Sequence, residues 1–265
     1  MTGILVLILF LLMVAVGGER GAIAVLVLCG NILVLAGTII LLAKGYPVFL
    51  VVFLAAVIIS YISLMKQNGK NVKTFAAFAA VTGIVFVLSI FIYLLVWKAQ
   101  SGGMNEIQSM QEDIMYFYES DIHISMLQIA VSVTILSALG AAIDTALSVT
   151  SAVYEVKQHR PELFQKELFD SGMQVGKEII GTTVNTLLFV YLGDSMLLFA
   201  YLKKGGYTIE TIVNSRFLFQ ELSVMLFGAV ACVLIVPFAA YCVAYVLSNE
   251  SGLKKSKFLH KNLQK

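Results

Sequence analysis

Charged side chains are scarce in this sequence. Asp, Glu, Lys and Arg make up only 13% of its 265 residues, while 59% are hydrophobic and the mean hydropathy is +0.91. A soluble domain usually carries about 25% charged residues. A water-soluble core of this size could not enclose so much apolar surface, whereas a bilayer solvates apolar side chains on every face of a helix. The composition therefore excludes an ordinary soluble domain and indicates a membrane protein.

The residues that build disulfide frameworks and metal sites are also few. The sequence has only three cysteines, Cys29, Cys232 and Cys242, and three histidines, His123, His159 and His260. Each cysteine lies in an apolar run, which favours a small core residue over a disulfide. No histidine lies near a cysteine or a second histidine, so no metal site is readable. We expect no enzyme and no cofactor, and a net charge of +2 is too small to suggest nucleic-acid binding.

What the sequence does contain is long apolar runs. A bilayer-spanning helix needs about 20 apolar residues. Seven runs qualify, and they are 3–17, 22–43, 47–65, 74–97, 124–154, 176–202 and 221–247. The first is short, but no basic residue precedes it and no convincing cleavage site follows it, so we interpret it as a helix and not as a signal peptide. We predict an all-α polytopic bundle of about seven transmembrane helices forming one domain over residues 1–250.

The distribution of Lys and Arg predicts the orientation. With the N-terminus outside, thirteen of the 18 basic residues fall in inner connections or in the basic tail 251–265. Cytoplasmic loops carry such an excess. The largest outer connection, 98–122, has five acidic residues against Lys98 alone. Only the Lys203–Lys204 pair speaks against this arrangement, so we expect the C-terminus inside.

The inner connection between the fifth and sixth runs has an amphipathic pattern. In "HRPELFQKELFDSG", Pro161 is suited to a first helical position, and Phe164 and Leu168 share a helical face. We predict a short helix over 157–175 that lies on the inner interface or beneath the bundle. A solvated helical connector is the alternative.

Two stripes of small and polar residues follow the helical period in runs five and six. In run five the stripe consists of Ser137, Ala141, Asp144, Ser148, Ser151 and Glu155, with Gly140 beside it. In run six it consists of Glu178, Thr182 and Asn185, with Gly181 and Lys177 alongside. Residues spaced by three and four lie on one face of a helix. We expect Ser137, Gly140, Ala141 and Gly181 to let the two helices approach closely.

The two stripes match in depth. Counted from Glu155 and Lys177 at about 1.5 Å per residue, Asp144 lies about 16 Å into the membrane and Asn185 about 12 Å. An ionised Asp at mid-bilayer costs about 2.5–3.5 kcal/mol on insertion scales, and no cation lies at the same depth. Two interpretations stay open. In the first, the stripes line a proton or ion path formed by Asp144, Ser148, Ser151, Thr182 and Asn185, with Glu155, Lys177 and Glu178 at its inner end. In the second, the stripes hold the two helices together by hydrogen bonds.

Asp194 in "YLGDS" invites comparison with intramembrane aspartyl proteases. However, Tyr191 stands where that motif requires Gly, and Asp194 lies about 25 Å from the inner end, far above Asp144. A catalytic pair needs carboxylates about 3 Å apart. We therefore expect no catalytic residue.

Two long motifs, "GAAIDTALSVTSAVYEV" (140–156) and "SGMQVGKEIIGTTVNTLLFVYLGDS" (171–195), resemble the YibE/F-like family of multipass membrane proteins. The likeness extends to "VGGERG", "KGYPVF", "NSRFLFQEL" and "IVPFAA", and so covers nearly the whole chain. The chain is similar to the shorter, YibF-like members. The resemblance implies a bacterial cytoplasmic-membrane protein and a paralogous YibE-like membrane subunit, or a second copy of the chain, as partner. The usual motif has Arg-Asp at 177–178 and Gly at 194.

A fainter likeness over 136–195 is to a six-helix half of RND-type permeases such as the Sec accessory proteins. There an Asp on one helix and Thr or Asn on the next belong to a proton path. It implies one subunit of an ion- or proton-coupled permease or exporter. The alternative is a non-transporting assembly or regulatory subunit that lies in the bilayer.

Overall fold

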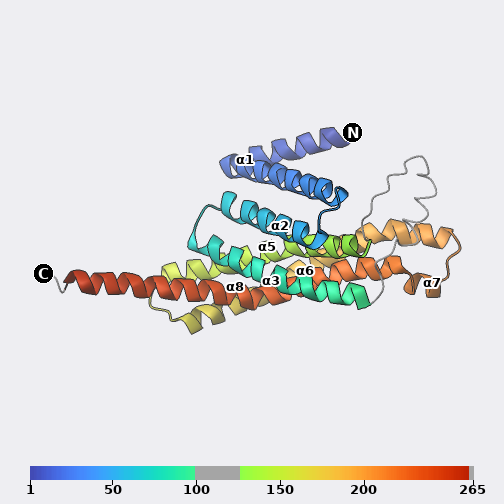
Figure 1. The fold of residues 1–265 in the computed structure, drawn as a ribbon. Helices are drawn as coiled ribbons and strands as arrows, with labels where there is room; N and C mark the ends of the chain where they lie inside the picture. Colours follow the sequence, from blue (N-terminus) through green and yellow to red (C-terminus); the bar gives the residue numbers. More distant parts are fainter. Residues whose placement is uncertain (99–125, 263–265) are drawn as a thin grey trace.

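The computed structural model describes residues 1–98 and 126–262, and every regular element in these two ranges is a helix. The expected all-α class is therefore confirmed. The acidic connection predicted at 98–122 lies outside the described residues from position 99 onward. The chain ends lie at opposite ends of an elongated bundle (Figure 1).

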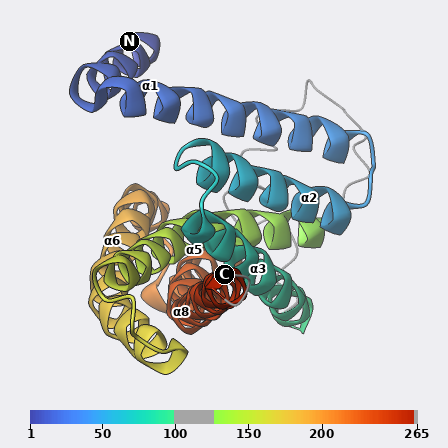
Figure 2. The ribbon, with the colours of Figure 1, turned by 90° about the vertical axis from the view of Figure 1, so that its left-hand side faces the viewer.

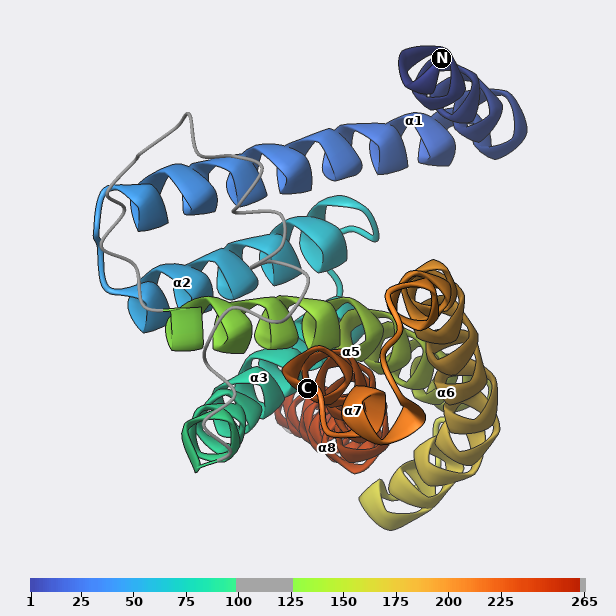
Figure 3. The same cartoon turned by 90° about the vertical axis from the view of Figure 1, so that its right-hand side faces the viewer.

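Four long helices form the centre of the bundle. They are α3 (Val72–Lys98), α5 (Met126–His159), α6 (Gln165–Lys204) and α8 (Arg216–Asn262). Helix α8 packs against α3, α5 and α6, and it is seen end-on among them in Figures 2 and 3. Its buried side consists largely of small residues, including Ala231, Ala239, Ala240 and Ala244. Small side chains let helix backbones approach closely, which is how helices associate when lipid is the solvent.

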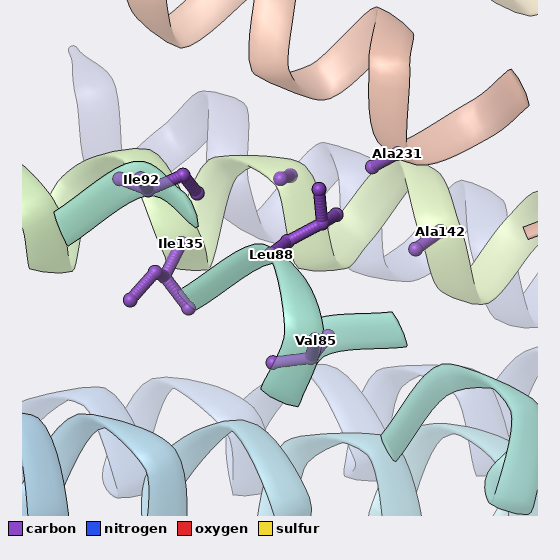
Figure 4. Close-up of a pocket in the computed structure, with 7 residues that line it drawn as sticks. Val85, Leu88, Ile92, Ile135, Ala142 and Ala231 are labelled. Atoms are coloured by element: carbon purple, nitrogen blue, oxygen red, sulfur yellow. The ribbon is translucent and has the colours of Figure 1, made fainter. Parts of the chain in front are cut away.

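The apolar centre is tightly filled. Val85, Leu88 and Ile92 from α3 meet Ile135 and Ala142 from α5 (Figure 4). Ala231 of α8 closes the group, and the space between these side chains has no room for a water molecule. Dense packing of this kind stabilises the middle of the bundle.

The N-terminal part of the chain lies at one side. Helix α2 (Val48–Tyr61) continues into the π-helical turn η1 (Ile62–Lys66), and α1 (Thr2–Ala43) packs on both. Figure 2 shows α1 as the outermost helix, separated from the centre by α2. Asn31 Nδ2 donates to Ser63 Oγ at 2.9 Å and so joins α1 to η1.

Helix α1 is bent sharply. Gly18 has φ 57° and ψ −135°, and the two halves fold back over each other (Figure 1). Gly21 is buried against the backbone of Met13, where a side chain would not fit. The predicted runs 3–17 and 22–43 are thus the two halves of one element.

Five helices are long and apolar enough to cross a membrane: α1, α2 with η1, α3, α5 and α8. Helix α6 does not meet the same criterion over its described residues. The chain is therefore a multi-pass membrane protein by its helices, while the count of seven spans stays a prediction.

The connection between α5 and α6 differs from the prediction. No separate helix occupies 157–175, because α5 runs to His159 and α6 begins at Gln165. Lys157 Nζ donates to the carbonyls of Pro161 and Leu163, both at 2.8 Å, and so fixes a turn where Pro161 was expected to begin a helix. The start of α6 is set by Glu167, whose carboxylate accepts from the Phe164 N–H at 2.8 Å. An acidic side chain in the first turn satisfies a free backbone donor there.

Of the remaining elements, one is a short helix that was not among the predicted runs, and α8 contains the predicted run 221–247. Helix α7 (Ile209–Val213) is a short turn of helix after α6, capped by Thr208 Oγ1, which accepts from the Thr211 N–H at 3.2 Å. Helix α8 contains Pro237 in its interior. Proline removes one backbone hydrogen bond from a helix, which membrane helices tolerate where neighbours pack around the site. Helix α8 continues to Asn262 through most of the predicted basic tail.

Candidate functional site

Helix α5 carries the predicted stripe on its exposed side. Gly140, Asp144, Ser148 and Glu155 are exposed, and Ser151 is half-buried. The opposite side of the helix is buried among α3 and α8 through residues such as Ala142, Ala146 and Val149. The periodicity correctly groups these polar residues on one face, and the fold turns that face outward.

Helix α6 presents its own stripe in the same way. Lys177, Glu178, Gly181, Thr182 and Asn185 are all exposed. The buried side of α6 faces α8 and the C-terminal end of α5. Figure 3 shows α5 and α6 beside each other around α8. We call the exposed polar residues of α5 and α6 together the polar face.

The close approach that we expected between the two stripes is not seen at either of their glycines in the described part of the chain. An ideal Cβ at Gly140 or Gly181 meets no atom within 4 Å, so neither glycine mediates a close approach here. Ala141 is buried and Ser137 half-buried. The period of a stripe fixes which residues share a face, but the direction of that face depends on how the other side of the helix packs.

The polar groups of this face do not bond to one another. Ser148 Oγ donates to the Asp144 backbone carbonyl at 2.8 Å, and Thr182 Oγ1 donates to the Ile179 carbonyl at 2.9 Å. Both hydroxyl groups therefore donate their hydrogen bonds to the backbone of their own helix. Among the side chains that the structure describes, none donates a hydrogen bond to the Asp144 carboxylate and none is a partner of the Asn185 amide.

The end of the face that Glu155 and Lys177 occupy is equally open. Glu155 and Lys177 are both exposed, and no ion pair joins them in the described part of the chain. Their expected place together at the inner end of a proton or ion path stays a prediction. Of Asp194, which we expected to have no role, the structure describes only its place in α6.

Close contacts among α5, α6 and α8 come from residues outside the two stripes. An ideal Cβ at Gly172 would lie 2.8 Å from both Ala240 Cβ and Val153 Cγ2, and one at Gly176 would overlap the side chain of Val236. Gly172 and Gly176 form a Gly-x-x-x-Gly pair, the pattern that marks close helix packing in membranes. That signal was present in the sequence, and it identifies the packing side of α6.

One further polar contact crosses between helices. Thr145 Oγ1 lies 2.9 Å from the Ala141 carbonyl and 3.6 Å from Cys232 Sγ on α8. Both residues are buried, which agrees with the interpretation of Cys232 as a small core residue. Among the described residues, no group of three or more His, Cys, Asp or Glu could hold a metal ion.

Comparison with curated proteins and with solved structures gives no match, so the faint likeness to RND-type permeases stays a resemblance. The family model described as YibE/F-like protein, in contrast, matches residues 5–249. This match covers both long motifs and nearly all of the described helices. The chain therefore belongs to the YibE/F-like family.

Proposed function

We propose that the protein is one subunit of an ion- or proton-coupled permease or exporter, and that a second membrane polypeptide covers its polar face. We further propose that Asp144 is the group that takes up and releases the proton or cation. The observation that carries the proposal is an exposed, unpartnered carboxylate in the middle of a membrane helix. No catalytic step is part of the proposal.

Exposure of this face to lipid is energetically unfavourable. An Asp near the bilayer centre costs about 2.5–3.5 kcal/mol on insertion scales, and Glu178, Thr182 and Asn185 lie on the neighbouring helix. Ionisable residues in membranes almost always face a bundle interior or a water-filled path. A partner subunit, either a YibE-like paralogue or a second copy of this chain, would place Asp144 in such an interior.

The direction of the chain supports a topology with the N-terminus outside and the C-terminus in the bacterial cytoplasm. The termini lie at opposite ends of the bundle, and the turn that follows η1 lies at the C-terminal end with its lysines (Figure 1). The two halves of α1 and helix α6 would bring the number of spans to seven. Asp144 then lies between the two membrane surfaces.

The experiment uses the tagged chain purified from native membranes together with the proteins that copurify with it. The sample is reconstituted in liposomes that enclose a pH-sensitive dye, and a pH gradient is imposed. We expect the wild-type sample to dissipate the gradient faster than Asp144→Asn, because an amide cannot carry a proton. Asp170→Asn is the matched control, since Asp170 is an exposed acid near the start of α6 and is not one of the residues proposed to line the path.

The two candidate functions give different results. A sample in which Asp144→Asn matches the wild-type rate while the same proteins copurify would remove the proton-carrier role. It would leave the alternative, a non-transporting assembly subunit whose polar face binds its partner by hydrogen bonds. Loss of copurification in Asp144→Asn would point to the same alternative.

A further inference from the structure

A pocket of about 520 Å³ opens where η1 leads into α3. Its walls are apolar and come from four elements: Tyr61 of α2, Met65 of η1, Phe75 and Phe78 of α3, and Val246 of α8. The rings of Tyr61 and Phe78 meet edge to face with centroids 6.2 Å apart. The volume falls within the range of about 300–1,000 Å³ that is typical of small-molecule sites.

The mouth of the pocket is cationic. Lys70 and Asn71 line it, and Lys66 is exposed on the same turn. Lys73 is already engaged, with its Nζ 5.8 Å from the centroid of the Tyr154 ring. No Asp or Glu occurs in the sequence between Glu19 and Glu106. The lysine that faces the pocket is therefore not neutralised by any acid on the elements that form the turn.

The turn that carries the mouth is held by its own hydrogen bonds. Gly69 has φ 77°, a conformation that favours glycine, and it reverses the chain between η1 and α3. Thr74 Oγ1 accepts from the Asn71 N–H at 3.0 Å and lies 2.8 Å from the Gly69 carbonyl. This capping arrangement fixes the start of α3 and so fixes where Lys70 and Asn71 stand relative to the aromatic walls.

We propose that this pocket binds one anionic phospholipid. Its phosphate would lie at Lys70 and Asn71, and the upper part of an acyl chain would lie among Tyr61, Phe75 and Phe78. A fully polar solute would leave these aromatic walls without a partner, and an apolar helix of a second copy would leave Lys70 without an anion. Only a molecule with an apolar tail and an anionic head matches both ends.

In the proposed orientation, the pocket lies at a membrane surface where such lipids occur. The turn between η1 and α3, whose residues line it, lies at the end of the bundle toward which α8 runs (Figure 1). Basic pockets between membrane helices on the cytoplasmic side bind anionic headgroups, because that leaflet carries a negative surface potential. The assignment to the inner leaflet rests on the proposed orientation, whereas binding in the pocket does not.

The test is native mass spectrometry of the full-length chain in detergent, offered phosphatidylglycerol and phosphatidylcholine in equal amounts. We expect the wild type to retain phosphatidylglycerol preferentially, and Lys70→Gln to lower that preference by about fivefold, as expected for the loss of one interfacial lysine. Lys70→Arg should keep the preference. Lys203→Gln, an exposed lysine near the far end of α6, is the matched control and should leave it unchanged.

A second variant tests the apolar walls. Val246→Phe fills the pocket from α8 and should reduce retention of both lipids, and its thermal unfolding reports whether it is folded. Because Lys70 is on an exposed turn, the Lys70→Gln result stands even if Val246→Phe is unstable.

Several results would overturn the proposal. An unchanged preference for phosphatidylglycerol in Lys70→Gln would do so. An equal loss of that preference in Lys203→Gln would also do so, because it would indicate general attraction of the lipid to the surface charge. A folded Val246→Phe that retains lipid like the wild type would place the lipid elsewhere. Displacement of the lipid by soluble glycerol phosphate at equal concentration would show that the phosphate alone is recognised. A dimer of the chain that Val246→Phe disrupts would show that a protein partner, and not a lipid, occupies the pocket.

Discussion

Gly172 lies where α5, α6 and α8 meet, and the contact between these helices leaves no room for a side chain at this position. A Cβ there would stand 2.8 Å from both Ala240 Cβ on α8 and Val153 Cγ2 on α5. We expect Gly172→Ala to lower the free energy of unfolding by about 1–3 kcal/mol, the usual effect of overpacking a filled core. Thermal unfolding in detergent measures the change.

The control is a glycine with free space around it. Gly83 of α3 has no atom within 4 Å of an added Cβ, so Gly83→Ala should not lower stability. Equal melting temperatures for Gly172→Ala and Gly83→Ala would show that the helices do not approach as closely as the structure describes.

At the same scale, the sequence allowed one part of the site to be predicted and not the other. The spacing of Asp144, Ser148 and Glu155 placed them on one face, and the structure agrees. The spacing could not show that this face points outward, because the buried side of α5 is defined by Ala-rich contacts with α8 far along the chain. The Gly172–Gly176 pair did carry directional information, since glycines at that spacing mark the side on which helices touch.

At the scale of the element, the bend in α1 depends on a single residue. Gly18 has φ 57° and ψ −135°, a backbone conformation that is essentially restricted to glycine. We expect Gly18→Ala to destabilise the folded-back arrangement by about 1–3 kcal/mol. The adjacent Gly17 has ordinary backbone angles and no atom within 4 Å, so Gly17→Ala is the matched control.

The readout for this pair is the distance between the two halves of α1. A spin label near Thr2 and one near Ala43 should show a changed or broadened distance distribution in Gly18→Ala and not in Gly17→Ala. Indistinguishable distributions in the two variants would mean that Gly18 does not control the bend.

Element boundaries were predictable to the extent that hydropathy determines them. The runs 47–65 and 74–97 correspond closely to α2 with η1 and to α3, because lipid-facing helices are apolar throughout. The start of α6 was not predictable in this way. It depends on the Glu167 carboxylate, which accepts from the Phe164 N–H, and on the two hydrogen bonds that Lys157 donates. Hydropathy carries no signal for either interaction.

In the molecule as a whole, the buried centre is apolar and the polar groups of the candidate site are exposed. The buried centre formed by α3, α5 and α8 is apolar, while the polar groups of α5 and α6 lie on the outside. A water-soluble protein has the same arrangement, but this chain's other exposed surfaces are strongly apolar, as on α1 and α8. This polar face between apolar ones is the surface that the proposed second subunit would cover.

The number of membrane crossings can be decided with single cysteines in a chain cleared of Cys29, Cys232 and Cys242. Thr2, Glu19 and Lys44 are exposed and mark the start, bend and end of α1. If both halves cross, Thr2→Cys and Lys44→Cys should label from outside with a membrane-impermeant maleimide, and Glu19→Cys only after permeabilisation.

The same method tests whether α6 crosses the membrane. Cysteines at Glu162 and Lys204, on either side of α6, should label from opposite sides. Thr2 and Lys44 labelling from opposite sides would make α1 a single crossing, and Glu162 and Lys204 labelling from one side would remove α6 from the spans.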